Sequence, residues 1–158
     1  IDAGSSAGDS IVASGSAVNA ELTSSNNGFT ASTINFSNIN NADLNNGELT
    51  GTNSNDETFT ITSTDNAVNV NAIDFTQVSA INAGTSADDA IVASGSAVNA
   101  ELTSSNNGLT ASTIDFSNIN NADLNGGELI GTNDNDETFT ITSTDANEVN
   151  VNLSLIHI

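Results

Sequence analysis

The chain has 158 residues and a formal net charge of −20, because it contains 20 Asp and Glu residues but no Lys or Arg. Nucleic acids and anionic membranes are therefore excluded as partners, since binding to either relies on basic side chains. The chain also lacks Cys, so it forms no disulfide or Cys-based zinc site. With 36% hydrophobic and only 13% charged residues, it is too apolar for a disordered polyanion and indicates a folded chain with a core of small aliphatic residues and six Phe.

The sequence consists of two nearly identical units. Residues 11–65 recur at 91–145 with five substitutions, and residues 1–10 match residues 81–90 more loosely. The repeat is therefore about 80 residues long. We assign residues 1–80 to the first unit and residues 81–152 to the second, and we expect the two units to form one continuous array.

Short strands separated by turns are predicted throughout each unit. Apolar and polar residues alternate at Ile34–Phe36, Thr58–Thr62 and Val68–Asn71, which predicts strands that bury only one face. Asn-Gly pairs, such as Asn27-Gly28 and Asn46-Gly47, predict the turns between them. No segment has the pattern of an amphipathic helix, so the fold class is all-β.

Apolar anchor residues follow one another about 20 residues apart, four to each unit. This spacing predicts a parallel β-solenoid (β-helix) with about 20 residues per coil. The Phe residues expected to stack inside it are Phe36, Phe59, Phe75, Phe116 and Phe139. The alternative is a pair of tandem Ig-like β-sandwiches of about 80 residues each. A weaker echo of about 40 residues within each unit favours the solenoid.

Acidic residues recur at three predicted corners, formed by residues 51–56, 84–89 and 131–136. In stacked coils these carboxylates would approach one another, and two unit charges about 5 Å apart repel by roughly 0.8 kcal/mol even in water. Calcium would relieve this repulsion, because Ca²⁺ prefers carboxylate and backbone oxygens. The predicted ligands are Asp56, Glu57, Asp88, Asp89, Asp136 and Glu137. The competing interpretation is that these residues are solvated and keep the protein soluble.

The tail formed by residues 153–158 departs from the repeat. It reads LSLIHI where the repeat predicts Ala-Ile-Asp-Phe, and it resembles translated sequencing-adapter read-through in metagenomic gene fragments, so we interpret it as an artefact. Its His157 is the only His of the chain, which leaves a Ser-His-Asp triad or a His-ligated metal without support. The regularly spaced acidic residues single out no glycosidase pair, so we expect no enzymatic activity.

Two strings, FSNINNADLNGGELIGTNDNDETFTI and IDFTQVSAINAGTSADDAIVASG, resemble the repeat regions of large secreted bacterial surface proteins, the haemagglutinin-like and RTX-like adhesins. The resemblance covers nearly all of residues 1–152. It implies an extracellular or cell-surface location and a role in a repetitive stalk or filament.

Near-identity of the two units bears on function as well. An active site requires a unique set of residues, whereas an array that provides length can duplicate its unit freely. We therefore expect a structural segment of an adhesin stalk or extracellular filament that associates with further copies of the same repeat into a rod or fibre. The alternative is a calcium-dependent adhesive module that binds glycans or surfaces.

Overall fold

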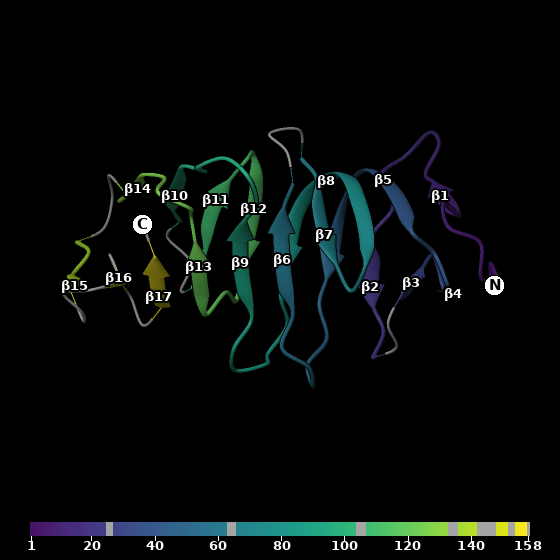
Figure 1. Cartoon of the computed structure of the whole chain (residues 1–158), viewed down its shortest axis with the longest axis horizontal. Coiled ribbons are helices and arrows are strands. Elements are labelled where there is room, and N and C mark those ends of the chain that lie inside the picture. The colour runs from purple at the N-terminus through teal and green to yellow at the C-terminus, as the bar shows by residue number, and fades with distance from the viewer. Residues whose placement is uncertain are drawn as a thin grey trace.

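The computed structural model describes residues 1–24, 27–62, 66–103, 107–132, 136–141, 148–151 and 154–157, and these residues form strands and turns but no helix (Figure 1). The strands are β1 (Ser10–Val12), β2 (Ala20–Leu22), β3 (Gly28–Ala31), β4 (Ile34–Ser37), β5 (Asn41–Thr50), β6 (Thr58–Ile61), β7 (Val68–Val70), β8 (Ile73–Asn82), β9 (Ala90–Ala93), β10 (Ala100–Leu102), β11 (Leu109–Ala111), β12 (Ile114–Ser117), β13 (Asn121–Asp123), β14 (Leu129–Ile130), β15 (Phe139–Ile141), β16 (Glu148–Val151) and β17 (Ser154–His157). The predicted all-β class is confirmed.

Strands of successive turns stack in parallel. Ser10 of β1 is paired with Asn41 of β5, and Asn41 is paired with Asp74 of β8. In the same way β6 pairs with β9, and β9 with β13. The chain is therefore a parallel β-solenoid of about four turns, as predicted. The pairing also shows that one turn takes roughly 30 residues, so the predicted length of about 20 residues per coil is wrong.

The extra length of each turn comes from antiparallel hairpins inside it. Strands β2, β3 and β4 form one antiparallel meander, and β6, β7 and β8 form another. Phe59 and Phe75, which were counted as anchors of successive coils, both lie in the second meander. The anchor spacing therefore measured the distance between strands of one turn rather than the distance between turns.

Two-residue turns close these hairpins. Ser32 and Thr33 join β3 to β4 with φ angles of 47° and 67°, and Asn71 and Ala72 join β7 to β8 with 51° and 61°. Positive φ at both central residues is typical of the type I′ turn, whose twist matches that of a hairpin. The predicted Asn corners also adopt positive φ, including Asn27 and Asn46 in the first unit.

The two units form one continuous sheet system, because β8 connects them. It pairs with β5 of the first unit along one edge and with β12 of the second unit along the other. Figure 1 shows the strands following one another along the long axis of the molecule, from β1 near the N-terminus to β15 at the other end. The alternative of two tandem Ig-like sandwiches is therefore wrong.

The core runs along the axis of the solenoid and contains Phe29, Phe59, Phe75 and Phe116, all buried. Phe29 links neighbouring turns, since its ring centroid lies 5.5 Å from that of Phe75 in an edge-on arrangement. Two of the predicted core positions differ. Phe36 is only partly buried, although its ring centroid lies 5.3 Å from that of Phe29.

Phe139 is the clearer exception, because its side chain is 47% exposed. Its counterpart in the first unit, Phe59, is fully buried. The difference follows from strand pairing. Strand β6, which carries Phe59, is covered by β9 of the next turn, whereas among the described strands β15 pairs only with β16.

The tail keeps the strand pairing of the repeat even though its sequence departs from it. Leu155 of β17 is paired with Asn121 of β13, just as Asp74 is paired with Asn41 in the first unit. Strand β17 also pairs with β16 in antiparallel fashion. The interpretation of the tail as an artefact stays a prediction.

The two equivalent Phe residues provide a test of the fold. Phe59→Ala should lower the free energy of unfolding by about 3–5 kcal/mol, because it removes a fully buried ring. Phe139→Ala should cost about 1 kcal/mol or less in dilute solution, because nearly half of its ring is already in water. Chemical denaturation of both variants measures the difference. Equal costs would contradict the placement of Phe139 at an uncovered edge.

Candidate functional site

Two acidic corners of adjacent turns lie in direct backbone contact. One is formed by residues 51–57 and the other by residues 83–89. A Cβ atom added to Gly51 would lie 2.3 Å from the carbonyl oxygen of Ala83, and one added to Gly84 would lie 2.2 Å from that of Thr52. Only glycine permits so close an approach. These two glycines therefore bring the acidic side chains of the corners together.

Glu57 and Asp89 meet at this contact and are both buried, with exposed fractions of 2% and 0%. The backbone amide of Glu57 donates to Asp89 Oδ1 at 2.8 Å. The Glu57 carboxylate accepts from the Thr52 amide at 3.1 Å and from the Thr52 hydroxyl at 2.7 Å. In turn, the Asp89 amide donates to Asn120 Oδ1 at 3.2 Å. The pair thus connects three successive turns.

No basic side chain compensates these two carboxyl groups, because the chain has no Lys or Arg. Burial raises the pKa of Glu57, against the lowering effect of the Thr52 hydrogen bonds, and the charge of Asp89 raises it further. Burial also raises the pKa of Asp89, and the charges of Asp56 and Asp88 add to the effect. Within the described structure Asp89 Oδ2 is buried without a hydrogen-bond partner. The pair is therefore suited to hold a proton or a cation.

Asp56 and Asp88, two other predicted calcium ligands, lie on the surface of the same corners. Asp56 Oδ1 accepts from the Ser86 hydroxyl at 2.5 Å and from the Asp88 amide at 3.3 Å. Both carboxylates are exposed. Asp56 therefore stabilises the loop of the next turn through hydrogen bonds, and its neighbour Glu57 points inward.

Asp136 and Glu137, the remaining predicted ligands, lie at the other end of the solenoid from the N-terminus. The Glu137 carboxylate accepts from the amide and the hydroxyl of Thr132, which repeats the arrangement of Glu57 and Thr52. Asp136 is exposed. In the part of the chain that the structure describes, no three His, Cys, Asp or Glu side chains gather as a metal site would require. The six predicted ligands do not converge, and calcium binding stays a prediction.

Two residues that contact the pair, Thr52 and Asn120, were not among the predicted site residues. Asp9 is the repeat counterpart of Asp89, and its carbonyl accepts from the amides of Asn40 and Asn41, as that of Asp89 does from Asn120 and Asn121. Asp9 Oδ2 is also buried and has no partner among the described residues. The sequence indicates this equivalence, because Asp9 lies two residues before Ile11 as Asp89 lies two residues before Ile91.

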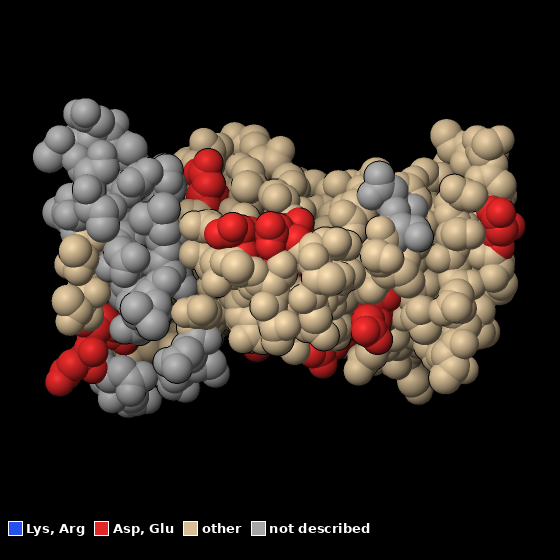
Figure 2. Space-filling view, turned by 90° about the horizontal axis from the view of Figure 1, so that it is seen from below, with Lys and Arg blue, Asp and Glu red and all other residues tan. Residues whose placement is uncertain are grey.

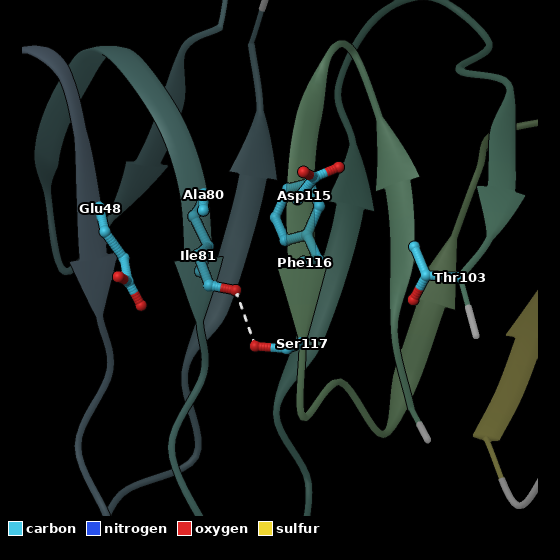
Figure 3. A pocket seen from close by; sticks show the side chains of 7 residues that line it. All are labelled: Glu48, Ala80, Ile81, Thr103, Asp115, Phe116 and Ser117. Carbon is cyan, nitrogen blue, oxygen red and sulfur yellow. Dashed lines mark hydrogen bonds between the residues drawn. The ribbon is translucent and has the colours of Figure 1, made fainter. Parts of the chain in front are cut away.

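A surface groove of about 250 Å³ crosses the unit boundary (Figure 3). It is lined by Glu48, Ala80, Ile81, Thr103, Asp115, Phe116 and Ser117. Glu48 and Asp115 lie on β5 and β12, on opposite sides of Ala80, and their carboxylates point in different directions. The Ser117 hydroxyl donates to the Ile81 carbonyl at 3.4 Å. The groove therefore brings no pair of carboxylates together.

The acidic side chains elsewhere are spread over the surface. Figure 2 shows them in separate patches with uncharged surface between, and no basic side chain interrupts them. Comparison with protein-family models, with curated proteins and with solved structures found no match to the chain. In the described ranges there is also no helix of the length and hydrophobicity that a membrane span needs.

Removal of the Glu57 charge tests the buried pair. The folded-state pKa values of Glu57 and Asp89 lie above their ordinary values of 4.5 and 3.8, so the folded chain retains protons that the unfolded chain releases. The pair therefore destabilises the fold at neutral pH, and this cost disappears as the pH falls toward those ordinary values. Glu57→Gln should raise the free energy of unfolding at pH 7 by on the order of 1 kcal/mol. The free energy of unfolding should also increase less on acidification in this variant than in the parent protein.

The measurement is urea denaturation between pH 7 and pH 4. A matched control is Glu21→Gln, which removes one charge from an exposed strand position and should leave the stability within about 0.5 kcal/mol of the parent protein. A Glu57→Gln protein that is less stable than the parent at pH 7 would contradict the unfavourable burial of this charge.

Proposed function

We propose that the chain is a structural segment of an adhesin stalk or extracellular filament and that it associates with further copies of itself into a rod or fibre. The observation that carries the proposal is the unbroken parallel stacking of turns through both units, with β8 shared between them. A stack of this kind transmits tension along its axis through a ladder of backbone hydrogen bonds, and adding repeats lengthens it without any change of design.

Polar side chains on the surface support the same role, because many of them connect neighbouring turns. Gln77 Nε2 donates to Asp43 Oδ2 at 2.9 Å, and Asn118 Nδ2 donates to Asn82 Oδ1 at 2.9 Å. Together with the hydrogen bond from Ser86 to Asp56, these contacts reinforce the stack from outside. Side chains that are engaged in this way serve the scaffold rather than a ligand pocket.

The resemblance to secreted bacterial surface repeats supports the proposed extracellular or cell-surface location. The charge distribution agrees with it, since a surface with a net charge of −20 stays hydrated and repels nonspecific contacts. Such a surface suits a stalk that must hold its shape while exposed to solvent.

Electron microscopy and fibre diffraction of the purified protein test the structural role. Short rods are expected in dilute solution and longer fibres at high concentration, with a strong repeat near about 4.8 Å along the axis from the stacked strands. Particles that stay single at every concentration and salt condition would contradict self-association.

The second candidate function is a calcium-dependent adhesive module for glycans or surfaces. One observation favours it: the buried Asp89 Oδ2 has no partner among the described residues and lies beside Glu57, and carboxylate oxygens are the ligands that Ca²⁺ prefers. A bound cation would satisfy this oxygen and neutralise the pair.

Calcium titration decides between the two candidates. If the adhesive candidate is right, Ca²⁺ added to chelator-treated protein should raise the melting temperature by several degrees, and Glu57→Gln should reduce the rise. Glycan binding on an array should also be lost on chelation. An unchanged melting temperature up to millimolar Ca²⁺ would exclude the calcium-dependent candidate and leave the structural role.

A further inference from the structure

Most of the exposed large apolar side chains of the described residues belong to strands at the two ends of the solenoid, namely β1 and β4 near the N-terminus and β14 and β15 at the opposite end (Figure 1). The set near the N-terminus is Ile1, Val12 and Ile34, and the set at the opposite end is Ile130 and Phe139. For Ile1, Ile34 and Phe139 the repeat counterparts inside the stack, Ile81, Ile114 and Phe59, are buried. Ile1 is 68% exposed whereas Ile81 is 1% exposed, and Phe139 is 47% exposed whereas Phe59 is fully buried. The ends therefore expose surfaces that the interior of the same molecule buries.

The interior shows how such surfaces fit together. We call the contact between residues 51–61 and residues 83–93 the unit junction. In it β6 and β9 pair in parallel, with Phe59 opposite Ile91, so that both side chains are buried. The close approach of Gly51 to Ala83 and the hydrogen bond from the Glu57 amide to Asp89 belong to the same contact.

The sequences of both halves of the unit junction recur at opposite ends of the chain. Residues 131–141 repeat residues 51–61 with the single change of Ser54 to Asp134, which lies outside the described residues. Residues 3–13 repeat residues 83–93 and keep the Ala, Gly, Asp and Ile positions that make the contact. Among the described strands β15 pairs only with β16, and β1 only with β5.

We propose that copies of this chain assemble head to tail, with β1 of one copy added in parallel to β15 of another in the register of the unit junction. Ile11 would then lie opposite Phe139, as Ile91 lies opposite Phe59. This inference rests on the proposed function of a self-associating structural segment and names its interface. The partner is a second copy, because the contact continues an interface that the molecule already contains.

Polar groups at the two ends match as well. Asp9 Oδ1 is placed to accept from the Glu137 amide, as Asp89 Oδ1 accepts from the Glu57 amide. Ser6 is placed to donate to Asp136, as Ser86 donates to Asp56. Gly4 and Gly131 allow the close backbone approach, since an added Cβ atom at Gly4 meets nothing within 4 Å and one at Gly131 meets only Glu137 and Phe139.

The geometry of the contact gives an open filament. The two surfaces differ and lie at opposite ends of one molecule, so each added copy exposes the same surface again and no closed dimer results. Assembly must overcome repulsion between chains of charge −20, and screening by salt weakens this repulsion. Fibre formation should therefore increase from low to physiological ionic strength.

Disulfide trapping tests the register, because the chain has no Cys of its own. Thr60 is paired with Val92 in the unit junction, so Thr140 of one copy should face Val12 of another. A mixture of a Val12→Cys protein and a Thr140→Cys protein should form disulfide-linked heterodimers under mild oxidation. The register control is a mixture of the Val12→Cys protein with a Thr138→Cys protein. These two positions are two residues out of register, so the mixture should yield about fivefold less disulfide-linked heterodimer.

A second variant tests the apolar contact without cross-linking. Phe139→Asp should abolish fibre formation, as measured by sedimentation, while leaving the fold of the single chain unchanged, because Phe139 is partly exposed there. Phe139→Leu is the matched control and should assemble.

The outcomes separate this inference from the proposed function. The head-to-tail register would be overturned if fibres form but no disulfide-linked heterodimer is trapped, or if the Phe139→Asp protein assembles as well as the parent. Either result would leave the proposed function, a self-associating structural segment, standing. Cross-linking mainly between two Val12→Cys copies would also overturn it. Absence of any assembly would overturn both.

Discussion

Parallel stacking of one turn on the next is the interaction on which the rest of the structure depends. Among the strands whose burial the structure describes, none buries more than a few side chains, and the core residues are mostly Ile, Val, Leu and Ala. Each turn therefore needs its neighbours to cover its inner face and to satisfy its backbone amides. The absence of Pro fits this requirement, because nearly every strand position has to donate or accept a hydrogen bond.

The same stacking explains how two acidic groups come to be buried in a chain without a single basic side chain. The close backbone approach at Gly51 and Gly84 places Glu57 against the next turn. There the Glu57 amide donates a hydrogen bond to Asp89, and the Glu57 carboxylate accepts one from the Thr52 hydroxyl. The hydrogen bonds offset only part of the lost hydration, which is why the pKa of each group is raised. The corner is thus a place where continuity of the stack is maintained at a local electrostatic cost.

Nearly identical sequences have different surroundings in the two units. Phe59 and Phe139 occupy the same position in the repeat, yet one is fully buried and the other is 47% exposed. The pairing partners of their strands account for the difference. The proposed structural role and the proposed filament interface both rest on one property of the repeat, namely that its strand edges pair with each other along the axis.

The sequence by itself determined the all-β class, the tandem repeat, the Asn corners and the absence of any basic partner for the acidic groups, because these depend on composition and on local alternation. It also held an unused signal, since Glu57 lies two residues before Phe59 and alternation puts both on the inner side. Only the tertiary structure decided the length of a turn. The hairpin at Ser32 and Thr33 has no Gly or Asn in its turn, so β3 and β4 could not be recognised as one hairpin within one turn. Which carboxylates meet was likewise decided by contacts between residues roughly 30 positions apart, because register across turns is set by packing and not by local sequence.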